Sequence, residues 1–145
     1  MGRVSLGVIA ALFSLALSAA ARAEATDPPA FAYLLHCSGC HLEDGSGDPK
    51  IVPDLRHDLG LLLDSPEGRS YMLRVPGVAD TPIAAQEMTD LMNWLIGTLY
   101  PQRVDFVPFS IDEVRDAREN RLSDPLKYRK QLFSKLLSSA EVLGK

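Results

Sequence analysis

Cys37-Ser38-Gly39-Cys40-His41 is the stretch that decides how this 145-residue chain is interpreted. Two thiols three positions apart, with a histidine directly after the second, have the spacing typical of covalent c-type haem attachment. Residues three apart on a helical turn share one face, so Cys37 and Cys40 can bond one edge of a porphyrin while His41 binds its iron. The motif therefore predicts one covalently attached haem c, with His41 as the proximal iron ligand.

Three other interpretations of two close cysteines remain open: a structural disulfide, a thioredoxin-like dithiol and half of a zinc site. A structural zinc site needs four ligands at recognisable spacing, and the only further histidines are His36 and His57. A dithiol oxidoreductase places its cysteines where a strand runs into a helix, and no β-rich pattern precedes Cys37. Haem attachment is the interpretation that the sequence favours.

Residues 1–23 have the pattern of a cleaved export signal. Arg3 lies near the start, an apolar run follows over residues 4–17, and Ala21-Arg22-Ala23 offers a small-residue cleavage site. The apolar run is shorter than the roughly 20 residues needed to cross a bilayer. We therefore expect a periplasmic protein that begins at Glu24 and has no stable membrane insertion after cleavage.

The net charge limits the classes of partner. Without Arg3 and Arg22 the chain keeps 13 basic against 19 acidic side chains, a net charge of −6. A nucleic-acid partner would call for a basic surface and is not expected. Residues 124–145 carry a net +3, whereas residues 24–123 carry −9. Such an asymmetry can orient a redox partner during encounter, although a solvated helix face explains it at least as well.

The chain predicts an all-α fold. Pro28-Pro29 opens a helix that brings both cysteines to its C-terminal end, and residues 43–53 have the Gly, Asp and Pro content of a loop. Short helices are expected over 55–63 and 66–74, followed by a turn at 75–78.

The strongest helical pattern spans residues 84–99, where apolar side chains recur at three- and four-residue steps before Pro101. The stripe consists of Met88, Leu91, Met92, Leu95, Ile96 and Leu99. Further along, Ser110 and Glu113 form a capping-box signature, and Ser123-Asp124-Pro125 opens another helix. Neither helix is long enough to be stable alone, so each is expected to dock on the preceding domain or on a partner.

Together these features resemble the class I c-type cytochromes, the small helical monohaem electron carriers. The resemblance runs from Asp27 to Pro101 and rests on the Cys-x-x-Cys-His motif after a first helix, a Gly-rich loop, Pro53-Asp54-Leu55, and Asn93-Trp94-Leu95 in the last helix. It implies a cytochrome c-like haem domain at 24–101 with a C-terminal helical extension at 102–145.

Within the site, the resemblance implies that the carbonyl of Pro53 accepts the NH of the proximal imidazole. It also implies that the first and last helices cross near a glycine or an aromatic residue, and Trp94 suits that position. A haem propionate could be bound by Arg69 or Arg74, although a solvated helix face explains both arginines more simply.

The distal methionine of the family is missing from its usual place. The family carries it in the loop before the last helix, where this chain has Val78. Met72 is the first candidate for a distal iron ligand and Met88 the next, with Met92 deeper in the same helical stripe. His57 would give bis-histidine ligation, and an iron without a distal protein ligand is the remaining possibility.

The resemblance implies a periplasmic cytochrome that carries single electrons from a dehydrogenase to a cytochrome or an oxidase. It would be a free carrier or an electron-transfer subunit, and not itself an enzyme. The missing loop methionine motivates an alternative, a haem protein with an open distal site that binds a small ligand or peroxide. The expected distal segment shows no histidine or paired acid that would assist peroxide chemistry.

Overall fold

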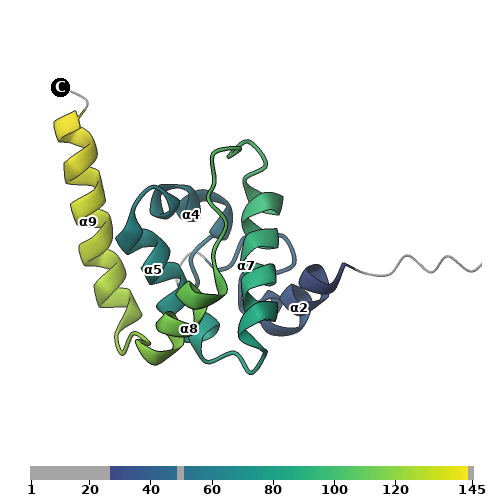
Figure 1. Ribbon diagram of the computed structural model, residues 1–145. Coiled ribbons are helices and arrows are strands. Elements are labelled where there is room, and N and C mark those ends of the chain that lie inside the picture. The colour runs from purple at the N-terminus through teal and green to yellow at the C-terminus, as the bar shows by residue number, and fades with distance from the viewer. Residues whose placement is uncertain (1–26, 49–50, 144–145) are drawn as a thin grey trace, which may run out of the picture.

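The computed structural model describes residues 27–48 and 51–143, and every regular element in that part of the chain is a helix (Figure 1). The expected all-α class is therefore confirmed. The elements are α2 (Pro28–His36), α3 (Ser38–His41), α4 (Leu55–Leu63), α5 (Pro66–Arg74), α6 (Pro76–Ala79), α7 (Ala85–Leu99), α8 (Ile111–Glu119) and α9 (Pro125–Leu143). The predicted export signal at 1–23 lies outside the described residues.

Short polar side chains fix the starts of three helices. The carboxylate of Asp54 accepts the backbone N–H of Arg56 at the start of α4, and the Ser65 hydroxyl accepts the N–H of Gly68 at the start of α5. Both sides of the predicted capping box between Ser110 and Glu113 are present at α8. These caps satisfy N–H groups that have no partner inside the helix. The predicted bounds of 55–63 and 66–74 are confirmed.

Two predicted boundaries differ from the structure. The first helix ends at His36 and restarts at Ser38, because the Cys37 backbone turns to φ −120° and ψ −36°. The hydroxyl of Ser38 donates to the carbonyl of Leu34, a side-chain bond of the kind that competes with regular helix geometry. The turn expected at 75–78 instead contains a one-turn helix, α6, which Pro76 opens with its fixed φ.

The central helix of the fold is α7, which packs against α2 on one side and α8 on the other (Figure 1). Its predicted apolar stripe is confirmed as core for five of its six members, and Leu99 packs against that core while partly buried. The five buried members are Met88, Leu91, Met92, Leu95 and Ile96. Where α2 meets α7, the rings of Tyr33 and Trp94 lie with their centroids 5.8 Å apart. Trp94 thus occupies the contact between the first and last helices of the resembling region.

Residues 102–122 complete the same core. Phe109, Val114 and Leu122 are all buried in one cluster with α5 and α7. The amide of Asn93 on α7 both donates to the carbonyl of Phe109, at 3.0 Å, and accepts its N–H, at 2.7 Å. The side chain of Asn93 therefore pairs with an extended backbone segment as a neighbouring strand would.

The last helix, α9, is attached along α5. Tyr128 stacks on Tyr71 with ring centroids 5.9 Å apart, Leu132 is buried, and the ammonium of Lys135 pairs with Glu67. Figure 1 shows α9 at the end of the molecule away from α2. None of the described helices is long and apolar enough to cross a membrane.

The helices α4 and α5 approach closely at Gly68, where α5 meets the end of α4. A Cβ atom at Gly68 would overlap the backbone carbonyl of Leu62, whereas a Cβ atom at Gly97 on α7 would meet nothing within 4 Å. Backbone atoms cannot give way as a flexible side chain can, so α4 and α5 can pack at this distance only around a glycine.

We expect Gly68→Ala to lower the free energy of unfolding by about 1–3 kcal/mol because α4 and α5 must separate. The matched variant Gly97→Ala is expected to raise the same quantity by about 0.5–1 kcal/mol, because alanine favours a helix over glycine. Guanidinium unfolding followed by far-UV circular dichroism measures both. Equal effects of the two substitutions would contradict the close packing of α4 on α5.

Candidate functional site

The Cys37–His41 motif forms a tight helical turn at the end of α2. The carbonyl of Cys37 accepts the N–H of Cys40 at 3.1 Å and that of His41 at 2.9 Å. Cys37 is half-buried and packs on the core, whereas Cys40 is exposed. Both thiols are free, and they belong to residues four and one positions before His41.

The imidazole of His41 is held from one side. Its Nδ1 lies 3.2 Å from the carbonyl oxygen of Pro53, and only a protonated Nδ1 can donate to that oxygen. This contact leaves Nε2 unprotonated and able to bind a metal in the neutral ring. The contact that the resemblance implies is present, and its role beside an iron stays a prediction.

Burial favours the uncharged forms of the His41 imidazole and of the Cys37 thiol. Burial lowers the pKa of His41, and the hydrogen bond to Pro53 offsets part of this effect. Burial, together with the neighbouring Cys40, raises the pKa of the Cys37 thiol to about 11. Near neutral pH, the site therefore presents a neutral imidazole and a protonated Cys37.

Tyr33 supports the motif from the core side, and sequence reasoning missed this role. Its hydroxyl donates to the carbonyl of Leu42 at 2.7 Å, and its ring packs on Trp94. Leu42 directly follows His41 and has φ 54°, in the left-handed region that side chains other than glycine rarely adopt. The bond from Tyr33 therefore holds a strained residue in place and fixes the direction in which the chain leaves the motif. Burial also raises the pKa of Tyr33 to about 12.

The loop after the motif folds back onto it. The N–H of Gly47 donates to the carbonyl of His41 at 3.2 Å, and a Cβ atom at Gly47, where φ is 64°, would crowd the carbonyls of Val52 and Pro53. The N–H of Leu55 donates to the carbonyl of Gly45 at 2.9 Å and closes the loop. Glycine at position 47 thus allows the loop to bring Pro53 to the His41 ring.

The three methionines considered as distal ligands all lie in the core. Met72 on α5 is 3 % exposed, and Met88 and Met92 on α7 are 1 % and 4 % exposed. All three belong to the cluster on which the Cys37 side chain packs. Their side chains therefore belong to the core, and the structure leaves the choice among them as a prediction.

The other two positions considered for the distal side differ from the methionines. His57 is exposed on α4, and its Nδ1 lies 3.3 Å from the carboxylate of Asp54. Val78 on α6 is partly buried against the core, so the usual place of the family's methionine holds an aliphatic side chain.

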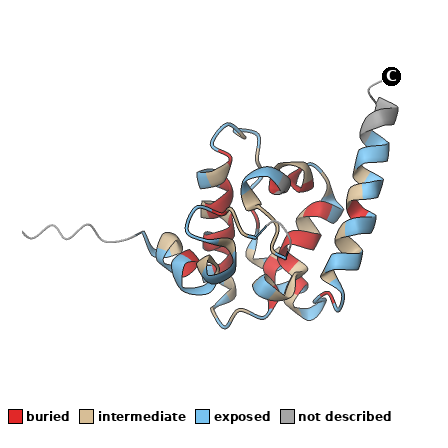
Figure 2. Ribbon diagram, turned by 180° about the vertical axis from the view of Figure 1, so that it is seen from behind, coloured by how far each residue is buried: buried red, intermediate tan, exposed pale blue. Residues whose placement is uncertain are grey.

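Large apolar side chains are exposed around the motif, a feature that helical periodicity on α2 alone did not reveal. Phe31, Leu34 and Leu35 on α2 are 52 %, 43 % and 63 % exposed, and Leu42 directly after the motif is 51 % exposed. In Figure 2 this end of the molecule shows long exposed stretches of α2 beside buried positions. An apolar cofactor or a partner surface would remove such side chains from water.

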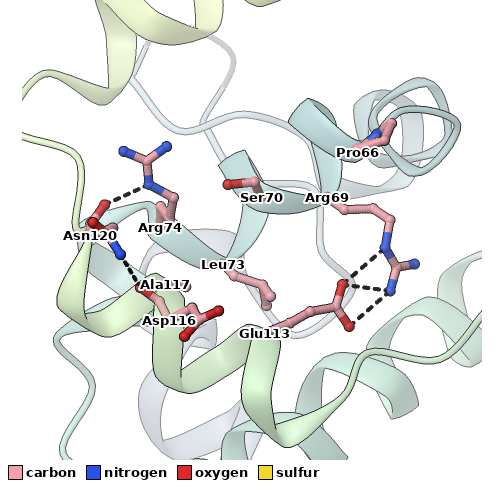
Figure 3. A pocket seen from close by; sticks show the side chains of 9 residues that line it. All are labelled: Pro66, Arg69, Ser70, Leu73, Arg74, Glu113, Asp116, Ala117 and Asn120. Atoms are coloured by element: carbon pink, nitrogen blue, oxygen red, sulfur yellow. Dashed lines mark hydrogen bonds and ion pairs between the residues drawn. The ribbon is translucent and has the colours of Figure 1, made fainter.

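Arg69 and Arg74 line a hollow between α5 and α8, where their side chains point to Glu113 and Asn120 (Figure 3). The guanidinium of Arg69 binds both carboxylate oxygens of Glu113 and lies 4.3 Å from the ring centroid of Phe109. The Nε of Arg74 donates to the carbonyl of Asn120 at 2.5 Å. Both arginines therefore join α5 to the segment that carries α8, which accounts for them without a propionate.

The donor set of the motif would fit a haem, whereas a thioredoxin-like dithiol and a zinc site lack features that they need. No strand enters the motif in the described part of the chain, as a thioredoxin-like dithiol would require. Across residues 27–48 and 51–143, no three His, Cys, Asp or Glu side chains converge on a point that could hold a bare metal ion. Two thiols on a turn and one oriented imidazole match what a covalently bound porphyrin needs. Compared with protein-family models, curated proteins and solved structures, the chain matches none.

In the haem-free chain, we expect iodoacetamide to alkylate Cys40 about tenfold faster than Cys37 at pH 8, because Cys37 is half-buried and its pKa is raised. The variants Cys37→Ser and Cys40→Ser let each remaining thiol be followed alone by mass spectrometry. In guanidinium the two rates should converge. Equal rates in the folded chain would contradict the different environments of the two thiols.

Proposed function

We propose that this chain is an exported monohaem c-type cytochrome that carries single electrons between a dehydrogenase and a downstream cytochrome or oxidase. The observation that carries the proposal is the arrangement of the motif turn, with two free thiols and an imidazole whose Nδ1 faces the carbonyl of Pro53. The role is that of a carrier, free or as a subunit, and not of an enzyme. A periplasmic location follows from the export pattern of residues 1–23.

Each residue of the motif has a separate task in this proposal. Cys37 and Cys40 would hold the porphyrin through thioether bonds, and His41 would bind the iron through Nε2. Pro53 keeps the proton on Nδ1 and sets the ring's orientation, and Tyr33 fixes the backbone that follows. When bound, the haem supplies an iron that gains and loses one electron.

The surroundings of the motif support a carrier. Cys37 packs on the core and the imidazole of His41 is held by Pro53, so few groups would have to rearrange when the charge on an iron changes. The exposed apolar side chains of Phe31, Leu35 and Leu42 offer a surface for brief contact with another protein.

A second candidate function, a haem protein with an open distal site, has one observation in its favour. The position that carries a methionine in the resembling family is Val78, an aliphatic residue that cannot bind iron. The buried methionines Met72 and Met88 favour the carrier, because the core on which Cys37 packs contains thioethers that could serve as a ligand.

We expect the chain, expressed with a periplasmic haem-attachment system, to gain the mass of one haem that survives denaturation. Cys37→Ala and Cys40→Ala should each leave at most one thioether, and the double variant should leave none, since the thiols form the bonds. His57→Ala is the matched control, because His57 is exposed and paired with Asp54. Intact-protein mass spectrometry measures the product. Absence of covalent haem in the unaltered chain would end the proposal.

We expect Met72→Leu to abolish the methionine-to-iron charge-transfer band of the oxidised protein and to admit carbon monoxide to the reduced protein. Met88→Leu and Met92→Leu should leave both properties unchanged, because leucine conserves core volume in all three variants. Optical spectra with and without carbon monoxide make the measurement. Loss of the band in Met88→Leu alone would assign the ligand to Met88, and rapid carbon monoxide binding by the unaltered chain would favour the open site.

A further inference from the structure

Positive charge in this chain is concentrated at its C-terminal end. Residues 24–123 carry a net −9 and residues 124–145 a net +3, although the two segments belong to one folded body. The concentrated cations lie on α9 as Lys127, Arg129, Lys130 and Lys135.

The basic side chains of residues 51–124 and those of α9 differ in whether they have partners within the chain. Every arginine between residues 51 and 124 donates to a carboxylate or a backbone carbonyl of its own chain; these are Arg56, Arg69, Arg74, Arg103, Arg115, Arg118 and Arg121. On α9, Lys135 pairs with Glu67. The ammonium groups of Lys127 and Lys130 are exposed, and neither has an ion-pair partner among the described residues.

The two faces of α9 have different chemistry. Tyr128, Leu132 and Leu136, at steps of four residues, pack on the core and on α5. Beside this packed face, a shallow hollow runs along Lys127, Lys130, Gln131, Ser134, Lys135 and Ser138, and Lys135 at its edge reaches Glu67 on α5. We call this hollow the outer face of α9. All six residues belong to one helix, so this hollow is a helix face and not an enclosed cavity.

Exposed leucines border this outer face. Leu126 is 68 % exposed and Leu137 is 55 % exposed. Apolar side chains beside unpaired lysines form the mixed surface that protein interfaces use. Charge steers the encounter of the two proteins, and apolar contact stabilises the complex.

The position of α9 separates this face from the motif. Figures 1 and 2, seen from opposite sides, both place α9 at one end of the molecule and α2 at the other. A protein bound to the outer face of α9 would therefore leave the end that carries Cys37–His41 uncovered.

We propose that the outer face of α9 binds an acidic surface of another protein, through Lys127 and Lys130 with Leu126 and Leu137 at the border. Charge complementarity selects this partner. A lipid membrane is disfavoured because the apolar face of α9 is already covered by α5. A second copy of this chain, whose residues 24–123 carry a net −9, is the competing acidic partner, and cross-linking from α9 distinguishes it from a different protein. The binding does not require a haem, so it stands or falls separately from the proposed function.

The test places a photoreactive residue, p-benzoylphenylalanine, at Gln131 in the full chain expressed in its own cell type. After irradiation, mass spectrometry identifies the cross-linked peptide. The expected product is a segment of a different protein that carries an excess of Asp and Glu. Cross-linking to lipid, to a second copy of this chain or to a segment without excess acid would overturn the proposal, as would the absence of any product.

Charge reversal provides the matched comparison. Lys127→Glu with Lys130→Glu is expected to reduce the cross-linking yield about tenfold, because charges at an interface steer association. Arg115→Glu with Arg121→Glu changes the net charge equally on α8 and the segment after it, where the replaced ion pairs are exposed and contribute little to stability. That control should keep the yield of the unaltered chain. Equal losses in both double variants, with unchanged thermal unfolding, would show a general charge effect and contradict a site on α9.

Discussion

The contact between Tyr33 and Trp94 is the constraint on which the rest of the structure depends. It joins the first helix to the central helix α7, and the same tyrosine donates its hydroxyl proton to the carbonyl after His41. A hydrogen bond of this kind is worth about 1 kcal/mol net, but leaving the hydroxyl of the buried Tyr33 unpaired would cost more. The packing of the core and the direction of the motif are therefore set by one side chain. A candidate site on a short turn obtains its rigidity from a helix more than fifty residues away in the sequence.

The segment after α7 contributes to that rigidity. Asn93 pairs with both backbone groups of Phe109, and Arg69 binds Glu113 while lying over the Phe109 ring. Because these bonds connect α5, α7 and α8, the methionines on α5 and α7 lie in a core closed by residues 109–122. The environment of the proposed iron ligand thus depends on residues that come after the region of family resemblance.

Local signals predicted most of the fold. Prolines, caps and apolar periodicity act within a few residues, so the bounds of α4 and α5, the capping box of α8 and the buried stripe of α7 could be read from the sequence. The break at Cys37 and the one-turn helix α6 were missed, because a side-chain bond from Ser38 and a single proline decide them against a broader helical or turn pattern.

For the candidate site, the sequence indicated the two thiols and His41, because a short motif encodes them, and the resemblance added the contact of Pro53 with the His41 ring. The tasks of Tyr33, Arg69 and Arg74 could not be predicted. Each depends on a contact between residues distant in the chain: Tyr33 with Trp94, Arg69 with Glu113, Arg74 with Asn120. Sequence spacing carries no signal for such pairs, which is why a solvated face and a propionate ligand were the only interpretations considered for the arginines.

The hydrogen bonds of the Cys37–His41 turn join residues close in the sequence, whereas the contacts that complete the core join residues far apart. The turn is held by bonds from the Cys37 carbonyl to residues three and four positions on, and such bonds form early and locally. The core is completed by the ion pair of Arg69 with Glu113 and by the hydrogen bond from the N–H of Leu122 to the carbonyl of Arg74. It can therefore form only when the last quarter of the chain is present. In the proposed export, which begins at the N-terminus, both thiols would emerge before the residues that complete the core. The proposed haem attachment would then act while the core is still open, before Cys37 becomes half-buried.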